Sequence, residues 1–131
     1  MEQLFILALV FIGIAAGGYA VRYQARRKRA LAIESLRLEP NAKGQPRILS
    51  FYGPSCDACD RQKVVLANLA RARPGLFSLE LRDATVDYDY AQQFGLMVVP
   101  TTVVIAGNGA IAAINSGYTA QSKLESQLDA A

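Results

Sequence analysis

The chain has 131 residues, enough for one small domain, and it contains two cysteines and no histidine. Its formal net charge is +3, but five of its 14 lysines and arginines lie in the run 22–29, so residues 31–131 carry nine basic and ten acidic groups. Because a nucleic-acid-binding domain concentrates positive charge on its folded surface, this distribution excludes nucleic acid as the partner.

Residues 1–21 are predicted to form a transmembrane anchor. The stretch 4–21 contains no charged side chain, and it is close to the roughly 20 apolar residues that a helix needs to cross a bilayer. Its three glycines weaken a soluble helix but are tolerated in membrane helices. The alternative is a helix buried in the core of a soluble protein.

A basic juxtamembrane segment and connector follows, residues 22–46. Five basic residues lie in the run 22–29, whereas only Glu2 is charged ahead of the apolar stretch. The positive-inside rule therefore predicts a single-pass protein of the cell membrane whose domain faces the cytoplasm. The basic run is also expected to attract anionic lipid headgroups. A secretory signal peptide ending near Ala20 is the alternative, with the domain outside the cytoplasm, but such peptides carry positive charge before their apolar core.

The next part of the chain predicts two strands and a helix. Residues 33–38 are expected to add one short strand, and 39–46 form a loop rich in proline, glycine and asparagine. Residues 47–53 are apolar and aromatic and lie between two prolines, which is typical of a buried strand. The helical pattern of 56–73 ends before Pro74.

The remaining elements alternate in the same way. Residues 76–83 predict a strand, and 88–94 predict a short helix with Asp87 as its N-cap. Two β-rich runs flank the Asn-Gly pair 108–109, which is the strongest short-range signal for a hairpin. Thr119 is expected to cap a last helix.

This order of elements predicts an α/β domain over residues 47–131, with a possible extra strand from 33. A mixed central sheet should be covered by helices on both faces. The first two strand–helix–strand passages are expected to be parallel crossovers, and the last two strands are expected to be antiparallel.

The only two cysteines, Cys56 and Cys59, lie three positions apart at the predicted start of a helix. A bridge between them closes a very short loop and removes little entropy from the unfolded chain, so stapling the fold does not explain it. A structural zinc site needs four Cys or His ligands, which this chain does not supply, so we predict no metal. Redox chemistry is the interpretation that fits.

That chemistry assigns different roles to the two sulfurs. Helix N–H groups and the helix dipole favour a thiolate at the first position, so Cys56 is expected to be the partly exposed nucleophile. Cys59, one turn further on, is expected to be more buried and to act as the resolving cysteine. Cys56 would attack a substrate disulfide, and Cys59 would then attack Cys56 and release the reduced substrate.

Three stretches carry a resemblance to a known family: ILSFYGPSCDAC (48–59), VVPTT (98–102) and NGAIAAINSGYTAQSKLESQL (108–128). They are similar to the strand with its Cys-x-x-C, the cis-proline loop, and the final hairpin, glycine and helix of thioredoxins. The chain from about residue 33 onward therefore resembles a thioredoxin-family domain, with a thioredoxin-like fold.

The resemblance implies further site residues. It implies a cis bond between Val99 and Pro100, opposite the cysteines, and it places Gly117 at the glycine of the family. In such domains the loop before the cis-proline offers backbone groups to an extended substrate segment, a role that falls here to Val99 and Pro100. Pro54 and Ser55, directly before the first cysteine, are expected to belong to the same substrate-binding surface.

The chain also departs from the pattern of the family. Ser55 replaces the usual tryptophan, and Asp57 with Ala58 replaces the usual Gly-Pro between the cysteines. Ser50 stands where the family usually has a buried acid that deprotonates the second cysteine. The Asp57 carboxylate is expected to disfavour the Cys56 thiolate and to make the protein a reductant. Without an acid at Ser50, resolution of the mixed disulfide should be slow.

The sequence therefore predicts a membrane-anchored thiol–disulfide oxidoreductase that reduces substrate disulfides through Cys56 and Cys59. Its expected partners are protein disulfides, a recycling reductase and membrane lipid, and no cofactor is expected. Because a fold does not guarantee an activity, two alternatives stay open: a non-catalytic, membrane-tethered binding module and an extracytoplasmic thiol-exchange factor.

Overall fold

A computed structural model describes the backbone of residues 1–131 and every side chain except that of Glu34. The chain divides into two compact units, Met1–Ala32 and Ile33–Ala131. The four named strands all belong to the second unit.

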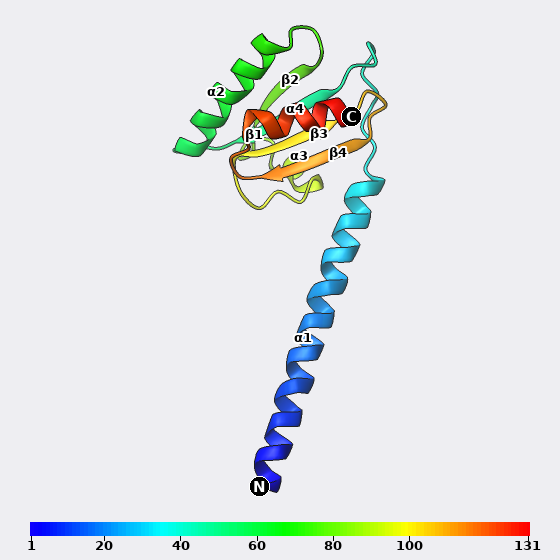
Figure 1. The fold of residues 1–131 in the computed structure, drawn as a ribbon, viewed down its shortest axis with the longest axis vertical. Helices are drawn as coiled ribbons and strands as arrows, with labels where there is room; N and C mark the ends of the chain where they lie inside the picture. Colours follow the sequence, from blue (N-terminus) through cyan, green and yellow to red (C-terminus); the bar gives the residue numbers. More distant parts are fainter. The chain divides into compact units, whose positions relative to one another are not determined.

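The first unit is formed by one long helix, α1 (Glu2–Ser35), which runs on into the start of the second unit (Figure 1). Between Glu2 and Ile33 this helix is long and apolar enough to cross a membrane, and none of its most apolar window is buried inside the protein. At 1.5 Å per residue, 34 residues span about 51 Å, against about 30 Å for the hydrocarbon core of a bilayer.

The strand expected over residues 33–38 does not form. α1 continues to Ser35, because its last residues are mostly good helix formers, and a single isolated bridge then joins Arg37 to Ala110. The Leu38 N–H donates to the Gly109 carbonyl oxygen at 2.9 Å. A β-carbon at Gly109 would overlap the Leu38 carbonyl oxygen, so this close approach needs glycine.

The core of the second unit is a four-stranded sheet in the order β2-β1-β3-β4 (Figure 1). The strands are β1 (Arg47–Tyr52), β2 (Ser78–Asp83), β3 (Thr101–Ile105) and β4 (Ile111–Ser116). β1 pairs with β2 in parallel, whereas β1 with β3 and β3 with β4 are antiparallel. The predicted hairpin around residues 108–109 is confirmed as the β3–β4 connection.

The second strand–helix–strand passage is not the parallel crossover that we expected. β2 ends beside Tyr52, and β3 begins opposite Phe51, so the chain leaves β2 and enters β3 at the same end of the strands. The connecting helix α3 (Tyr88–Gln93) has six residues and rises only about 9 Å, roughly half of the length of a six-residue strand. It is too short to carry the chain back along the sheet.

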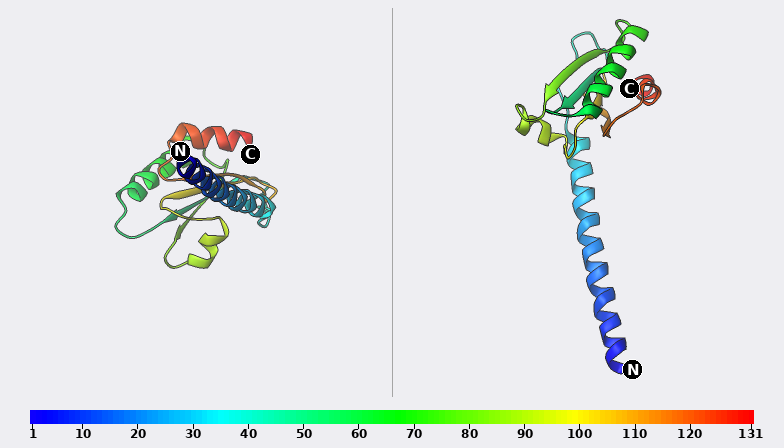
Figure 2. Two further views of the ribbon diagram at one scale, coloured as in Figure 1. Left: turned by 90° about the horizontal axis from the view of Figure 1, so that it is seen from below. Right: turned by 90° about the vertical axis from the view of Figure 1, so that its left-hand side faces the viewer.

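Different helices cover the two faces of the sheet (Figure 2). On one face, α2 (Asp57–Ala72) and α4 (Gln121–Ala130) pack in a core of the buried residues Ile48, Leu66, Leu69, Val104, Leu124 and Leu128. On the other, α3 adjoins a core of Leu49, Phe51, Ala84, Ala91, Phe94, Val103 and Ile105. Neighbouring residues of β1 and β3 therefore point to opposite faces, and the predicted mixed sheet with helices on both faces is confirmed.

The two predicted helix caps have different outcomes. Asp87 is the N-cap residue of α3, as predicted, but its side chain makes no capping hydrogen bond and instead accepts one from Arg82 at 3.4 Å. The residue before α4 is Ala120 rather than Thr119. Thr119 is buried and donates its N–H to the side chain of Gln62, so it connects the turn before α4 to α2 instead of capping α4.

Candidate functional site

The two cysteines lie where β1 leads into α2. β1 ends at Tyr52, and a short turn that includes Pro54 and Ser55, both exposed, connects it to the helix. Ser55 has a φ of 52°, the left-handed conformation that serine rarely adopts. Cys56 is the N-cap of α2, and Cys59 lies in its first turn.

The Cys56 sulfur lies at the N-terminus of α2. It forms a disulfide with Cys59, whose Cα atom is 5.2 Å away from that of Cys56, and it accepts a hydrogen bond from the Cys59 N–H at 3.1 Å. This N–H and the helix dipole favour a negative charge on the sulfur once the disulfide is reduced. Cys56 is half-buried, whereas Cys59 is only 2% exposed, so Cys56 is the accessible sulfur of the pair.

The loop before β3 lies directly against the cysteine turn. The Val99-Pro100 bond is cis, as the resemblance implied. The Val99 carbonyl oxygen lies 3.9 Å from Cys56 Sγ, and a β-carbon on Gly53 would come within 3.2 Å of the Val99 side chain. Among the described residues the Val99 N–H has no hydrogen-bond partner. It is therefore available to an incoming chain.

The rest of this loop is held rigidly. The Thr101 hydroxyl donates to the Val98 carbonyl oxygen at 2.6 Å, and the Gly117 N–H donates to the Pro100 carbonyl oxygen at 2.8 Å. Gly117 has a φ of 84°, which explains why glycine is required at this position. The flanking carbonyls are thus occupied, while the amide of Val99 stays open.

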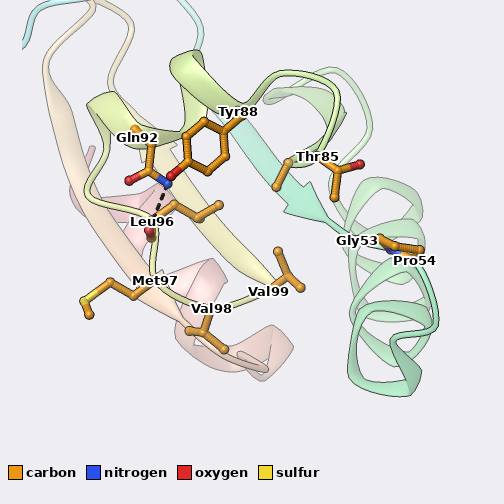
Figure 3. A pocket seen from close by; sticks show the side chains of 10 residues that line it. Gly53, Pro54, Thr85, Tyr88, Gln92, Leu96, Met97, Val98 and Val99 are labelled. Atoms are coloured by element: carbon orange, nitrogen blue, oxygen red, sulfur yellow. Dashed lines mark hydrogen bonds between the residues drawn. The ribbon is translucent and has the colours of Figure 1, made fainter.

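An apolar pocket of about 530 Å³ lies beside the cysteine turn (Figure 3). Its walls come from the turn after β1, from the segment after β2, from α3 and from the loop before β3: Gly53, Pro54, Ala84, Thr85, Tyr88, Gln92, Leu96, Met97, Val98 and Val99. Met97 is 84% exposed and Tyr88 60% exposed, although both are large and largely apolar. Gln92 donates to the Leu96 carbonyl oxygen at 3.3 Å and joins α3 to the loop.

Gln62 connects α2 to the turn before α4. Its side chain is 1% exposed, donates to the Thr119 carbonyl oxygen at 3.1 Å and accepts from the Thr119 N–H at 2.7 Å. Because Gly117 in the same turn binds Pro100, this contact links the cysteine-bearing helix to the cis-proline loop. No signal in the sequence pointed to this contact, because its two partners lie 57 positions apart.

Fixed charges lie close to the cysteine turn. The Thr85 hydroxyl and N–H donate to the Asp83 carboxylate at 2.6 and 2.8 Å, and these bonds lower the pKa of Asp83, with a smaller contribution from Lys63. Lys63 lies 4.2 Å from the centre of the Tyr52 ring, a cation–π contact at the end of β1. Asp57 is exposed in the first turn of α2.

Ser50 is buried in β1 at 3% exposure and is paired with Thr102 of β3. Both residues share the face of the sheet with Ile48 and Val104, which is the face that α2 covers. The Thr102 hydroxyl oxygen is buried and lacks a hydrogen-bond partner among the described residues. This layer thus presents hydroxyl groups under α2 in place of a carboxylate.

No protein-family model matches the chain, and no curated protein matches it. Solved structures do. A structure titled "Structure of a malarial protein" superimposes with a TM-score of 0.61 at 19% identity, over 66% of this chain and 96% of that chain. Thioredoxin-2, described as a component of malaria parasite protein secretion machinery, gives a TM-score of 0.65 at 18% identity, over 74% of this chain and 98% of its own. The folded unit has the thioredoxin-like fold.

Within this thioredoxin-like domain the structure brings together Pro54, Ser55, Cys56, Val99 and Pro100 around one accessible sulfur. Asp57 follows that sulfur in the chain, while Ser50 lies apart, buried in the sheet. The sequence did not indicate the pocket wall from α3, because it is assembled from residues that are distant in the chain.

Proposed function

We propose that the protein is a membrane-anchored thiol–disulfide oxidoreductase that reduces disulfides in protein substrates. The observation that carries this proposal is the position of the Cys56 sulfur: accessible, at the N-terminus of α2, and 3.9 Å from the Val99 carbonyl oxygen of the cis-proline loop. A sulfur placed in this way ionises easily and can be reached by another sulfur. The thioredoxin-like fold supports a thiol-redox role in general.

The reaction starts from the dithiol form of the pair. The Cys56 thiolate attacks one sulfur of a substrate disulfide, that disulfide breaks, and the departing substrate thiolate takes up a proton. Cys59 then gives up its proton and attacks Cys56 Sγ, which forms the Cys56–Cys59 disulfide and releases the second substrate thiol. Two electrons pass from the pair to the substrate. A separate dithiol reductase restores the pair, and no bound cofactor takes part.

Substrate binding is assigned to the surface around Val99. The free Val99 N–H can bind a carbonyl oxygen of an extended substrate segment, as in the pairing of a β-strand. The apolar pocket beside Pro54 and Met97 can hold a hydrophobic side chain near the substrate cysteine. We therefore expect substrates whose cysteine lies in an extended segment with an apolar neighbour.

Asp57 sets the direction of electron flow that we propose, and Ser50 sets the slow step. The Asp57 carboxylate, adjacent to Cys56 in the chain, opposes a negative sulfur and makes the reduced form less stable, which favours a reductant over an oxidant. Ser50 offers no carboxylate to take the Cys59 proton, so this proton must leave to water or to another group, and resolution is the slow step.

We assign α1 to the membrane, with residues 22–29 on the cytoplasmic side, next to anionic lipid headgroups. A reporter fused after Ala131 tests this orientation in cells. Activity of a cytoplasmic reporter is the expected result. Activity of an extracytoplasmic reporter, or removal of residues 1–20 from the mature chain, would favour the extracytoplasmic thiol-exchange factor.

Insulin disulfide reduction with dithiothreitol tests the activity. The full-length chain in micelles should accelerate insulin precipitation, and Cys56→Ser should abolish the acceleration. Cys59→Ser is the matched variant: it should lose turnover but accumulate a covalent adduct between Cys56 and insulin. If wild type and Cys56→Ser precipitate insulin at equal rates, the proposed activity is contradicted and the non-catalytic, membrane-tethered binding module is favoured.

A further inference from the structure

β2 forms one edge of the sheet and hydrogen-bonds only with β1 among the described strands (Figure 1). At the opposite edge, beyond β4, the segment after α1 makes one bridge through Arg37. An exposed strand with unpaired backbone groups can accept another strand.

The pairing with β1 determines which backbone groups of β2 are open. The N–H groups of Ser78 and Ala84, on either side of the strand centre, both point to β1. Because alternate residues of a strand point to opposite sides, Glu80 and Arg82 also pair toward β1. The N–H and C=O groups of Leu79 and Leu81 and the N–H of Asp83 therefore point away from the sheet and are open, whereas the Asp83 carbonyl oxygen already accepts from the Asp87 N–H at 2.9 Å.

The same strand exposes apolar side chains. Leu79 is 37% exposed and Leu81 is 44% exposed, on the face of the sheet that α2 covers. On the opposite face the strand carries an ion pair, with Arg82 Nη2 at 2.6 Å from Glu80 Oε1. Both of these side chains are about one-third exposed. The edge thus offers open backbone groups, two leucines and one charge of each sign.

We propose that β2 is an interaction surface for a second copy of this chain, with the two β2 strands pairing antiparallel about a two-fold axis at Leu81. Leu81 then lies opposite Leu81 of the second copy, and Leu79 lies opposite Asp83. The Leu81 pair then forms two inter-chain hydrogen bonds, and the Asp83 N–H of each copy donates to the Leu79 carbonyl oxygen of the other, for about four in all. The two sheets join into one that continues across both chains.

The charge pattern selects this register over its neighbours. With the axis at Leu81, Glu80 lies opposite Arg82 of the second copy, and Arg82 lies opposite Glu80, so two opposite-charge pairs form. A two-fold axis one residue earlier places Glu80 opposite Glu80, and one residue later places Arg82 opposite Arg82. Like charges directly opposite destabilise an antiparallel pair, whereas opposite charges stabilise it.

Cysteine cross-linking of the full-length chain in its membrane tests the register. In a Cys56→Ser, Cys59→Ser background, Leu81→Cys places two thiols on a pair whose Cα atoms are about 5.5 Å apart, within the range of a disulfide. The matched variant Leu79→Cys places its thiols about 13 Å apart along the strands. Mild oxidation should cross-link Leu81→Cys at least about tenfold faster than Leu79→Cys. Equal rates, or no dimer from Leu81→Cys, would overturn the proposal.

Charge exchange in the Leu81→Cys chain gives a second test. Glu80→Arg alone and Arg82→Glu alone should each lower the cross-linked fraction at least about threefold, because each creates like-charge pairs. Mixing differently tagged chains of the two variants should restore the hetero-dimer, since the introduced arginine of one chain then faces the introduced glutamate of the other. Failure of the mixture to recover, with both variants folded by circular dichroism, would contradict the proposed pairing.

Discussion

The contact between Gln62 and Thr119 offers a sharp test of how the cysteine-bearing helix is held. Gln62→Met keeps an unbranched side chain of similar length but removes both hydrogen bonds. The Thr119 N–H and C=O then lose their partners in a place where Thr119 is 4% exposed and Gln62 is 1% exposed.

The expected loss of stability follows from those two groups. Each buried backbone group left unsatisfied costs about 1–3 kcal/mol, so the free energy of unfolding should fall by about 2–6 kcal/mol. For a domain of this size that corresponds to a melting temperature lower by roughly 10–40 °C. Gln93→Met in α3 is the matched control, because Gln93 is exposed, and its effect should stay within about 0.5 kcal/mol.

Urea unfolding of the full-length chain in micelles measures this loss. Near-ultraviolet circular dichroism of the tyrosines is the suitable signal, since the chain has six tyrosines and no tryptophan. It reports tertiary packing, whereas far-ultraviolet signals also contain α1. If Gln62→Met unfolds within about 0.5 kcal/mol of the wild type, the two hydrogen bonds do not hold the helix as described.

Three further predictions concern groups around the cysteines. Asp57→His should raise the reduction potential of the cysteine pair, measured in glutathione buffers, by some tens of millivolts, where about 30 mV corresponds to 1.4 kcal/mol. An unchanged potential would show that Asp57 does not affect it. Ser50→Asp should speed resolution of a Cys56 mixed disulfide at neutral pH in stopped-flow experiments, and an unaltered rate would show that a base there is not limiting. The lowered pKa of Asp83 stabilises the fold above its unfolded value of about 3.9, and this contribution disappears as the pH falls through the folded pKa. Asp83→Asn should therefore unfold more easily at pH 7, by a difference that shrinks below about pH 4 in urea titrations; a gap that persists in acid would contradict the assigned bonds.

Local patterns were enough to predict much of the thioredoxin-like domain. The buried strand before the cysteines, the helix that begins at them and the hairpin at residues 108–109 depend on signals between near neighbours in the chain. The cis bond before Pro100 followed from resemblance to a family rather than from the residues alone. Together these predictions placed the cis-proline loop opposite the cysteines, and in the structure the Val99 carbonyl oxygen lies 3.9 Å from Cys56 Sγ.

Two predictions failed because competing local signals were misjudged. The direction of β3 depends on the short length of α3, and α1 continues to Ser35 because helix propensity outweighed a weak strand pattern over 33–38. Other features were missed because they depend on distant contacts. The polarity of Gln62 gave no indication of its partner, which lies 57 positions away. The pocket beside the cysteines is likewise formed only by tertiary packing.

The proposed reaction depends on the reactivity of one sulfur, and the rates of alkylation of the two cysteines test it most directly. The full-length chain would be reduced, treated with iodoacetamide over a range of pH, and mapped by mass spectrometry. We predict that Cys56 reacts at least about tenfold faster than the buried Cys59 and remains reactive below about pH 8. Comparable rates at both positions, or an unreactive Cys56 in the folded protein, would contradict the assignment.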